Sequence, residues 1–300
     1  MPVAVTGAAG FIGRHLVAAL HQRGHTVIGI DRRDALPAEA AVGVVADLSD
    51  RGSDVVTDVL HCADAVFHLA AFAGVRDHGP GAEQRRRLDN IEATRRVAEE
   101  VPLDVPLIVT SSSSVYGGSR GRACVETDAP LPRGGYAESK VEVERLCAKR
   151  VSRGGLVAVA RPFTVAGEGQ RPDMAIAGWL AAARQGRPLT VLGSPDRTRD
   201  ITDVRDVVKG LLAMADLGIR STVNLGTGRA HTLRALCLAV AAATGADVEL
   251  ALAPAGSEEV AATLADTERC ARLLGFVPST DLPALVQRQA AASLAVEELV

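Results

Sequence analysis

Three glycines within the first thirteen residues constrain the fold more than any other feature of this chain. Gly7, Gly10 and Gly13 follow a short apolar run, and an apolar-periodic segment begins at Phe11 and Ile12. This order predicts a strand, a tight turn and the start of a helix. Gly7 permits the turn, Gly10 lets a pyrophosphate approach the backbone, and Gly13 lets the helix lie close to the strand. Because the first N–H groups of a helix are unpaired and carry the positive end of its dipole, the segment predicts a dinucleotide site.

A glycine spacing alone is a weak signal, because a tight turn without any ligand also uses glycine. The context strengthens it. The helix stops at Gly24, and a second strand over residues 25–30 ends in Asp31, where an acid would hold the adenosine ribose hydroxyls. A carboxylate there repels a 2′-phosphate, which favours NAD over NADP, although the neighbouring Arg32 and Arg33 would favour NADP.

Strand-like and helix-like stretches alternate through the first half of the chain, which predicts an α/β fold with a doubly wound parallel Rossmann sheet. A third strand over residues 41–46 ends at Asp47 and Leu48, where an acid can hold the adenine amino group. A fourth over residues 65–71 ends with Leu69, Ala70 and Ala71. Three hundred residues allow a second unit. We expect an NAD-binding domain over residues 1–165, to which the chain returns later, and a smaller mixed α/β region over residues 166–300 that mainly binds substrate.

Composition argues against several classes of function. The net charge is −3, with 33 basic and 36 acidic side chains, and no basic stripe indicates nucleic acid. No apolar run approaches the length of a membrane span and no leader precedes the first strand, so we expect a cytoplasmic protein without a membrane partner. The five cysteines are scattered and are expected to be reduced. The seven histidines form no ligand cluster, so no metal is predicted.

Hydroxyl groups collect after the fifth predicted strand, residues 105–110. Ser112, Ser113 and Ser114 lie at its carboxyl end, where parallel sheets bind their ligands. A serine-rich loop that satisfies its own backbone is the alternative.

The next helix, predicted from Tyr136 to about Ser152, distinguishes these two interpretations. Tyr136 and Lys140 are four residues apart and therefore share one helical face. A nearby ammonium group and a nicotinamide cation would both lower the pKa of a phenol from about 10. Tyr136 would then act as a base.

Together these motifs resemble the extended short-chain dehydrogenase/reductase family of sugar-nucleotide epimerases and dehydratases. The resemblance covers nearly the whole chain. Its segments occur in order: residues 6–13, 112–117, 136–140, 161–175 and 197–206. It implies that Tyr136 is the catalytic base, that Lys140 binds the cofactor ribose and tunes Tyr136, and that Ser112 hydrogen-bonds the reacting oxygen.

The residues beside Ser112 separate the branches of the family. Relatives that eliminate water carry an acid pair at the positions of Ser113 and Ser114, and decarboxylating relatives also place a glutamate there. Because hydroxyl groups cannot replace those acids, both reactions are disfavoured.

Residues 161–175 look like the signature of UDP-glucuronate 4-epimerases, as do residues 73–76 with Arg76 and the serine run. These enzymes hold the substrate carboxylate with a threonine and an arginine, here Thr164 and Arg171. The alternative for Arg171 is a surface arginine beside a proline turn.

Two further residues are implied by the resemblance alone. Val191 lies in a segment, residues 189–192, whose backbone pairs with uracil in the family, and Arg199 corresponds to an arginine on the nucleotide diphosphate. An ion pair of Arg199 with Asp200 or Asp203 is the alternative.

The sequence also departs from the family pattern. Ala166 and Glu168 replace a tyrosine and a proline, and Asp203 and Arg205 replace a tyrosine and an aspartate in the later motif. These changes leave the sugar open.

The resemblance implies an NAD-dependent 4-epimerase of a nucleotide sugar, foremost a UDP-uronic acid such as UDP-glucuronate or UDP-galacturonate, acting through a transient 4-keto sugar. A UDP- or TDP-hexose epimerase or an NAD(P)H-dependent 4-keto-sugar reductase of deoxysugar or natural-product biosynthesis is an alternative, since either would use the same residues. A non-catalytic NAD-binding module is a third, against which Ser112, Tyr136 and Lys140 argue. A homodimer through the helices predicted over residues 83–100 and 136–152 is also implied.

Overall fold

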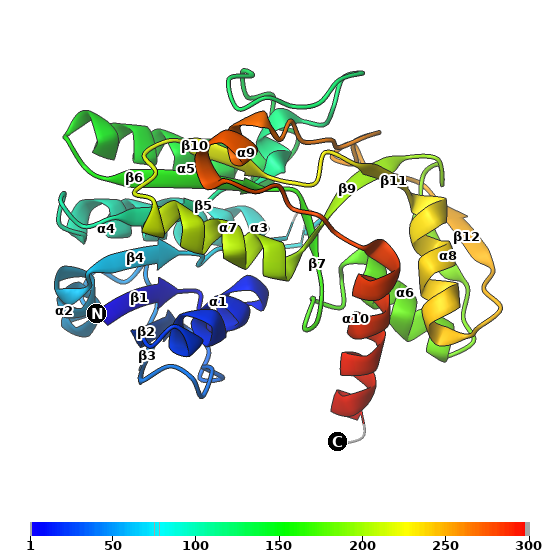
Figure 1. Ribbon diagram of the computed structural model, residues 1–300, viewed down its shortest axis with the longest axis horizontal. Helices are drawn as coiled ribbons and strands as arrows, with labels where there is room; N and C mark the ends of the chain where they lie inside the picture. The colour runs from blue at the N-terminus through cyan, green and yellow to red at the C-terminus, as the bar shows by residue number, and fades with distance from the viewer. Residues whose placement is uncertain (1, 75, 78, 298–300) are drawn as a thin grey trace.

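A computed structural model describes residues 2–74, 76–77 and 79–297 (Figure 1). Its centre is one parallel sheet. The strands are β1 (Pro2–Thr6), β2 (Thr26–Asp31), β3 (Val42–Val45), β4 (Ala65–His68), β5 (Leu107–Thr110), β6 (Val157–Pro162) and β10 (Thr222–Leu225). They lie in the order β10-β6-β5-β4-β1-β2-β3, with every neighbouring pair parallel. The predicted fold class is therefore confirmed.

Helices cover both faces of this sheet. Helices α1 (Phe11–Gln22), α7 (Val204–Asp216) and α9 (Glu268–Leu274) pack on one face with Leu16, Val207 and Cys270 in their shared core. On the other face lie α2 (Asp54–Cys62), α4 (Ala93–Glu100) and α5 (Gly135–Ser152), which share a core with the sheet. Strands buried on both faces read as continuous apolar runs, as β5 and β6 do here.

The predicted helix over residues 83–100 forms as three continuous segments. They are α3 (Ala82–Arg86), a π-helical turn η1 (Arg87–Glu92) and α4. Within it, Arg86 is buried and donates to the carbonyl oxygens of Gly74 and Asp77, while Arg85 and Arg87 are exposed.

The second unit lies beside the carboxyl end of the sheet, at the right of Figure 1. It contains a three-stranded sheet, β11-β9-β7, and a two-stranded sheet, β12-β8. Helices α6, α8 and α10 share a core around Trp179 and Leu236. The elements are β7 (Thr164–Ala166), α6 (Ala175–Arg184), β8 (Leu189–Leu192), β9 (Thr198–Asp203), β11 (Ala230–Thr232), α8 (Leu233–Thr244), β12 (Leu250–Ala253) and α10 (Leu282–Glu297).

Strand order reverses between β1 and β4. From β1 the chain proceeds to β2 and β3 on one side, and from β4 to β5 and β6 on the other. Parallel sheets bind ligands in the crevice at the carboxyl ends of such strands. A ligand-binding site is therefore expected at the loops after β1, β4 and β5. None of the helices described is both long and apolar enough to span a bilayer.

Candidate active site and cofactor cleft

The glycine loop between β1 and α1 leaves no room for side chains. Gly7 has φ 72°, and a Cβ there would lie 2.7 Å from the backbone nitrogen of Ala70. A Cβ on Gly13 would lie 2.1 Å from the carbonyl oxygen of Gly7. Gly10 is the N-cap of α1 and has no side chain that could cap it, so the first N–H groups of the helix stay open to an anion. The loop therefore fits a dinucleotide pyrophosphate.

Asp31, at the end of β2, faces this loop. Its Oδ2 accepts from the backbone N–H of Ala9 at 3.1 Å and its Oδ1 from that of Arg33 at 3.0 Å. Arg33 also pairs with Asp31 through its side chain, and Arg32 is ion-paired with Asp89 on η1. Both arginines have carboxylate partners, and the Asp31 carboxylate would repel a 2′-phosphate. This arrangement fits NAD.

Four further residues predicted to bind the cofactor lie at the start of α1 and after β3. Phe11 and Ile12 begin α1 and are half-buried. Leu48 is buried after β3, next to the exposed Asp47. Partial burial raises the pKa of Asp47, but hydrogen bonds from the Ser49 N–H and hydroxyl together with Arg32 leave it below its usual value.

The loop directly after β4 begins with the other residues predicted to bind the cofactor, Leu69, Ala70 and Ala71. The N–H of Leu69 donates to the carbonyl oxygen of Thr6 at 3.1 Å, and that of Ala70 donates to Thr6 Oγ1 at 3.3 Å. These bonds hold the two strand ends together at the reversal point of the sheet.

The Ser112, Tyr136 and Lys140 side chains converge at the carboxyl end of β5. Ser112 is the N-cap of η2 (Ser113–Tyr116), and its hydroxyl lies close enough to Tyr136 to lower the pKa of the phenol. Lys140 Nζ is buried, donates to the carbonyl oxygen of Thr110 at 2.9 Å and lies 6.0 Å from the centre of the Tyr136 ring. Burial lowers the pKa of Lys140 to about 8, against the charge of Glu144, which raises it.

The predicted lowering of the Tyr136 pKa concerns the site with a nicotinamide cation bound and stays a prediction. In the protein alone, burial raises the pKa of Tyr136, and neither the Ser112 hydroxyl nor the charge of Arg171 offsets this effect. A desolvated phenolate is costly because a charge in a low-dielectric site loses its hydration. Lys140 does not offset the effect of burial on the Tyr136 pKa, since its ammonium group donates to the carbonyl oxygen of Thr110.

Asn90 connects the loop after β4 to α5, the helix that carries Tyr136 and Lys140. Its Oδ1 accepts from the N–H of Phe72 at 2.7 Å, and its Nδ2 donates to Ser139 Oγ at 2.8 Å. Ser139 donates in turn to the carbonyl oxygen of Tyr136 at 2.7 Å. Asn90 is completely buried. It therefore holds the first turn of α5, including Tyr136, against the loop after β4.

The predicted sugar-binding residues lie around this centre. Arg171 forms a two-point ion pair with Asp173, at 2.9 and 2.7 Å, and donates to the carbonyl oxygen of Ala73 at 2.9 Å. It is near enough to Tyr136 to lower the pKa of the phenol. Thr164 begins β7 and is half-buried.

The serine run is partly satisfied by its own backbone. Ser112 Oγ accepts from the N–H of Ser114 at 3.1 Å, as the alternative interpretation expected. Ser114 Oγ, however, is buried and has no hydrogen-bond partner in the described part of the chain. Ser113 begins η2 and is half-buried. A buried hydroxyl without a partner fits a polar substrate group.

Arg199 pairs with neither of the acids considered from the sequence. Asp200 is occupied by the N–H groups of Thr227, Gly228 and Ala265, while Asp203 binds Arg288. Arg199 Nη2 instead lies 3.1 Å from Glu259 Oε2.

Arg76 lies on the other oxygen of the same carboxylate, 2.5 Å from Glu259 Oε1. Sequence reasoning missed Glu259, because it belongs to no motif and meets its partners only after folding. Val75, in the predicted stretch before Arg76, lies outside the described residues.

Val191 is buried in β8 and paired in register with Leu252 of β12. The contact of its backbone with uracil, which the resemblance implies, stays a prediction.

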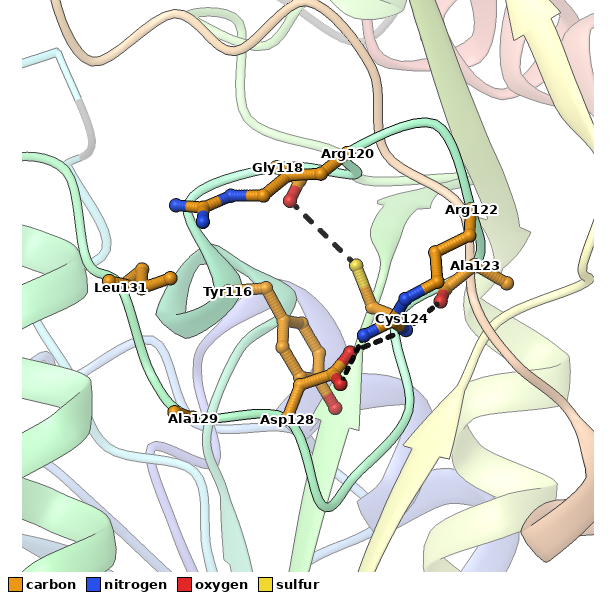
Figure 2. A pocket seen from close by; sticks show the side chains of 9 residues that line it. All are labelled: Tyr116, Gly118, Arg120, Arg122, Ala123, Cys124, Asp128, Ala129 and Leu131. Carbon is orange, nitrogen blue, oxygen red and sulfur yellow. Dashed lines mark hydrogen bonds and ion pairs between the residues drawn. The ribbon is translucent and has the colours of Figure 1, made fainter.

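A separate pocket lies in the loop after η2, outside the predicted site (Figure 2). Arg122 and Asp128 pair across it with nitrogen–oxygen distances of 3.0 and 2.6 Å. Its lining is Tyr116, Gly118, Arg120, Arg122, Ala123, Cys124, Asp128, Ala129 and Leu131. It contains none of the predicted catalytic or binding residues. Among the residues described, no three His, Cys, Asp or Glu side chains converge as a metal site.

A glycine loop at the reversal point of a parallel sheet, with an acid at the end of β2 and Ser, Tyr and Lys at the end of β5, defines an NAD-dependent Rossmann enzyme. A family model described as "NAD dependent epimerase/dehydratase family" matches residues 3–226. The chain belongs to this family.

Proteins of related sequence and solved structures of the same fold support this family assignment. An uncharacterised UDP-glucose epimerase, YtcB of Bacillus subtilis strain 168, is 33% identical over 94% of this chain and 94% of its own length. The solved structure of MoeE5 with UDP-glucose and NAD is 35% identical, with a TM-score of 0.90 over 99% of this chain and 100% of that one. UDP-glucuronic acid 4-epimerase from Bacillus cereus, with UDP-glucuronic acid and NAD, is 28% identical with a TM-score of 0.91 over both whole chains.

Proposed function

We propose that this chain is a 4-epimerase of a UDP-uronic acid, interconverting UDP-glucuronate and UDP-galacturonate. The observation that carries the proposal is the convergence of Ser112, Tyr136 and Lys140 at the end of β5, with Arg171 close enough to influence the phenol. Residues 1–165 would mainly hold the cofactor and residues 166–300 the sugar nucleotide, with β10 returning to the sheet.

In this proposal Tyr136 takes the proton of the C4 hydroxyl, and Ser112 hydrogen-bonds the same oxygen. Bound NAD would supply a reversible acceptor for the hydrogen and electron pair of C4. Lys140 would hold the cofactor ribose through its ammonium group. Ser113 and Ser114 carry no carboxyl group, so the site contains no second acid or base beside Ser112 for elimination. These roles support epimerisation without net redox change.

Recognition of the uronic acid would fall to Thr164 and Arg171. A guanidinium group binds a carboxylate through two parallel hydrogen bonds, as Arg171 does with Asp173. A substrate carboxylate would compete with Asp173 for the same two N–H groups. The structures of relatives with UDP-glucose and with UDP-glucuronic acid support a UDP sugar as the substrate class.

Incubation with a panel of UDP- and TDP-sugars, followed by NMR of the C4 configuration, tests the proposal. We expect UDP-glucuronate and UDP-galacturonate to interconvert without consumption of reduced cofactor, as read from nicotinamide absorbance. Stoichiometric oxidation of NAD(P)H with a 4-keto sugar would instead identify a reductase. Inertness toward both UDP-uronic acids would remove the proposed substrate.

A further inference from the structure

Three arginines contact one glutamate, Glu259, at the edge of the proposed sugar-nucleotide site, two of them through its carboxylate. Glu259 Oε1 lies 2.5 Å from Arg76 Nε, and Glu259 Oε2 lies 3.1 Å from Arg199 Nη2. Arg197 Nη1 donates to the backbone carbonyl oxygen of Glu259 at 3.1 Å. The arginines are close enough to act on one another, because Arg197 and Arg76 both lower the pKa of Arg199.

The four residues come from different parts of the chain. Arg76 lies in the loop after β4, beside the cofactor cleft, whereas Arg197 and Arg199 lie at the start of β9 in the second unit. Glu259 follows β12 and is nearly buried, while the Arg76 side chain is half-exposed. A single buried carboxylate therefore joins guanidinium groups of the two units that would otherwise repel one another.

The charge of this group matches one class of anion. Three guanidinium cations and one carboxylate leave a net charge of +2 on these four side chains. A nucleotide diphosphate esterified to a sugar carries two negative charges, one on each phosphate. Free nucleoside diphosphate carries a third at pH 8, because the second ionisation of a terminal phosphate has a pKa near 6.

We propose that Glu259 is a specificity-determining positioning residue. It holds Arg76 and Arg199 together and sets the cluster to the charge of a sugar-linked diphosphate, so that the enzyme favours its substrate over free nucleoside diphosphate. The inference rests on the proposed function, since it assigns the diphosphate of that substrate to these arginines.

The test is the ratio of two dissociation constants, for UDP-glucose and for UDP, measured by calorimetry at pH 8 on the purified NAD-bound protein. UDP-glucose is chosen because its sugar adds no charge. The Glu259→Gln variant lacks the carboxylate that holds Arg76 and Arg199 together, and its cluster is more positive. We expect UDP-glucose to bind more weakly and UDP to be affected less, so that the ratio of Kd for UDP-glucose to Kd for UDP rises by about tenfold.

Two variants serve as controls. Glu259→Asp keeps the charge and should keep the ratio close to that of the wild type even if both ligands bind more weakly. Glu249→Gln removes an equal charge at an exposed position just before β12 and should change neither constant.

Several outcomes would overturn the inference. An unchanged ratio in Glu259→Gln would reduce Glu259 to a structural residue, and tighter binding of UDP-glucose would make it a competitor of the substrate. Either result leaves the proposed function intact. Failure of the wild-type protein to bind UDP-glucose or UDP would instead overturn the proposed function, and this inference with it.

Discussion

Tyr136 and Tyr116 are the two tyrosines of the chain and have different surroundings. Tyr136 faces Ser112 in the cleft. The hydroxyl of Tyr116 donates to Asn224 Oδ1 at 2.7 Å and accepts from Arg161 Nη1 at 2.8 Å, inside a buried network. Replacing each tyrosine by phenylalanine therefore distinguishes a loss of turnover from a loss of folding stability.

Tyr136→Phe should lower kcat by about 10²- to 10⁴-fold, because the variant lacks the group that exchanges a proton with the C4 hydroxyl. Its NAD content, read from absorbance after denaturation, should stay at the wild-type level.

Tyr116→Phe is the matched control. It should lower the free energy of unfolding by about 1–3 kcal/mol, since Asn224 and Arg161 lose a buried partner, while the folded fraction turns over normally. If Tyr136→Phe retained full turnover, the assignment of the base would be wrong.

The limits of sequence reasoning are visible at these residues. The glycine loop and the Tyr136–Lys140 spacing could be predicted because each depends on local geometry along a few positions. The burial that raises the pKa of Tyr136 in the protein alone could not, because it depends on distant segments. The partner of Arg199 was equally hidden, since Glu259 lies 60 positions away and pairs with it only in the folded chain.

At the scale of elements, one chain of hydrogen bonds joins β1, β4 and η1. His68 Nδ1 lies 2.7 Å from Thr6 Oγ1, and His68 Nε2 lies 2.9 Å from Thr94 Oγ1. Thr94 donates onward to the carbonyl oxygen of Asn90 at 2.6 Å, so Thr94 accepts from His68 Nε2. The sequence did not predict this role of His68 in linking the two strands to the helix that carries Asn90.

Stability should depend on pH through His68. Burial, and then the charge of Lys140, lowers the pKa of His68 to about 3, whereas an unfolded histidine titrates near 6.5. Between these values the unfolded chain binds a proton that the folded protein rejects. The contribution is thus fully present above about pH 6.5 and is lost as pH falls toward 3, with a limiting slope of about 1.4 kcal/mol per pH unit.

Urea unfolding at pH 7 and pH 5 measures this effect. We expect the wild-type protein to lose more free energy of unfolding over this interval than His68→Gln, which keeps an acceptor and a donor but does not titrate. The other titrating groups are common to both proteins and cancel in the comparison. Parallel losses in the two proteins would show that His68 is not the group responsible.

At the scale of the whole molecule, the alternation of strands and helices in the first half of the chain was enough to predict the parallel central sheet. The order of the strands in the smaller sheets was not predicted. β7, β9 and β11 come from separate stretches of the chain, and β12 pairs with β8 across more than 50 intervening residues. Such pairing depends on long-range packing, which no local pattern records.

We expect two chains to associate through the face formed by η1, α4 and α5. This face carries half-buried apolar side chains, Leu88 and Ile91 on η1 and Leu146 on α5, next to Arg95 and Arg145. Apolar residues left half-exposed along packed helices are completed when a second copy adds its own pair, which would make a four-helix bundle. The rest of α5 packs inward through Val143 and Cys147, so the face is separate from the core.

Light scattering on the eluting protein should give twice the 31.1 kDa mass of one chain. Leu146→Glu should give a single chain, because it would bury a charge among the apolar side chains of that interface. Leu238→Glu, at an exposed position of α8, should remain a dimer. A monomeric wild-type protein would show that this face is not an interface.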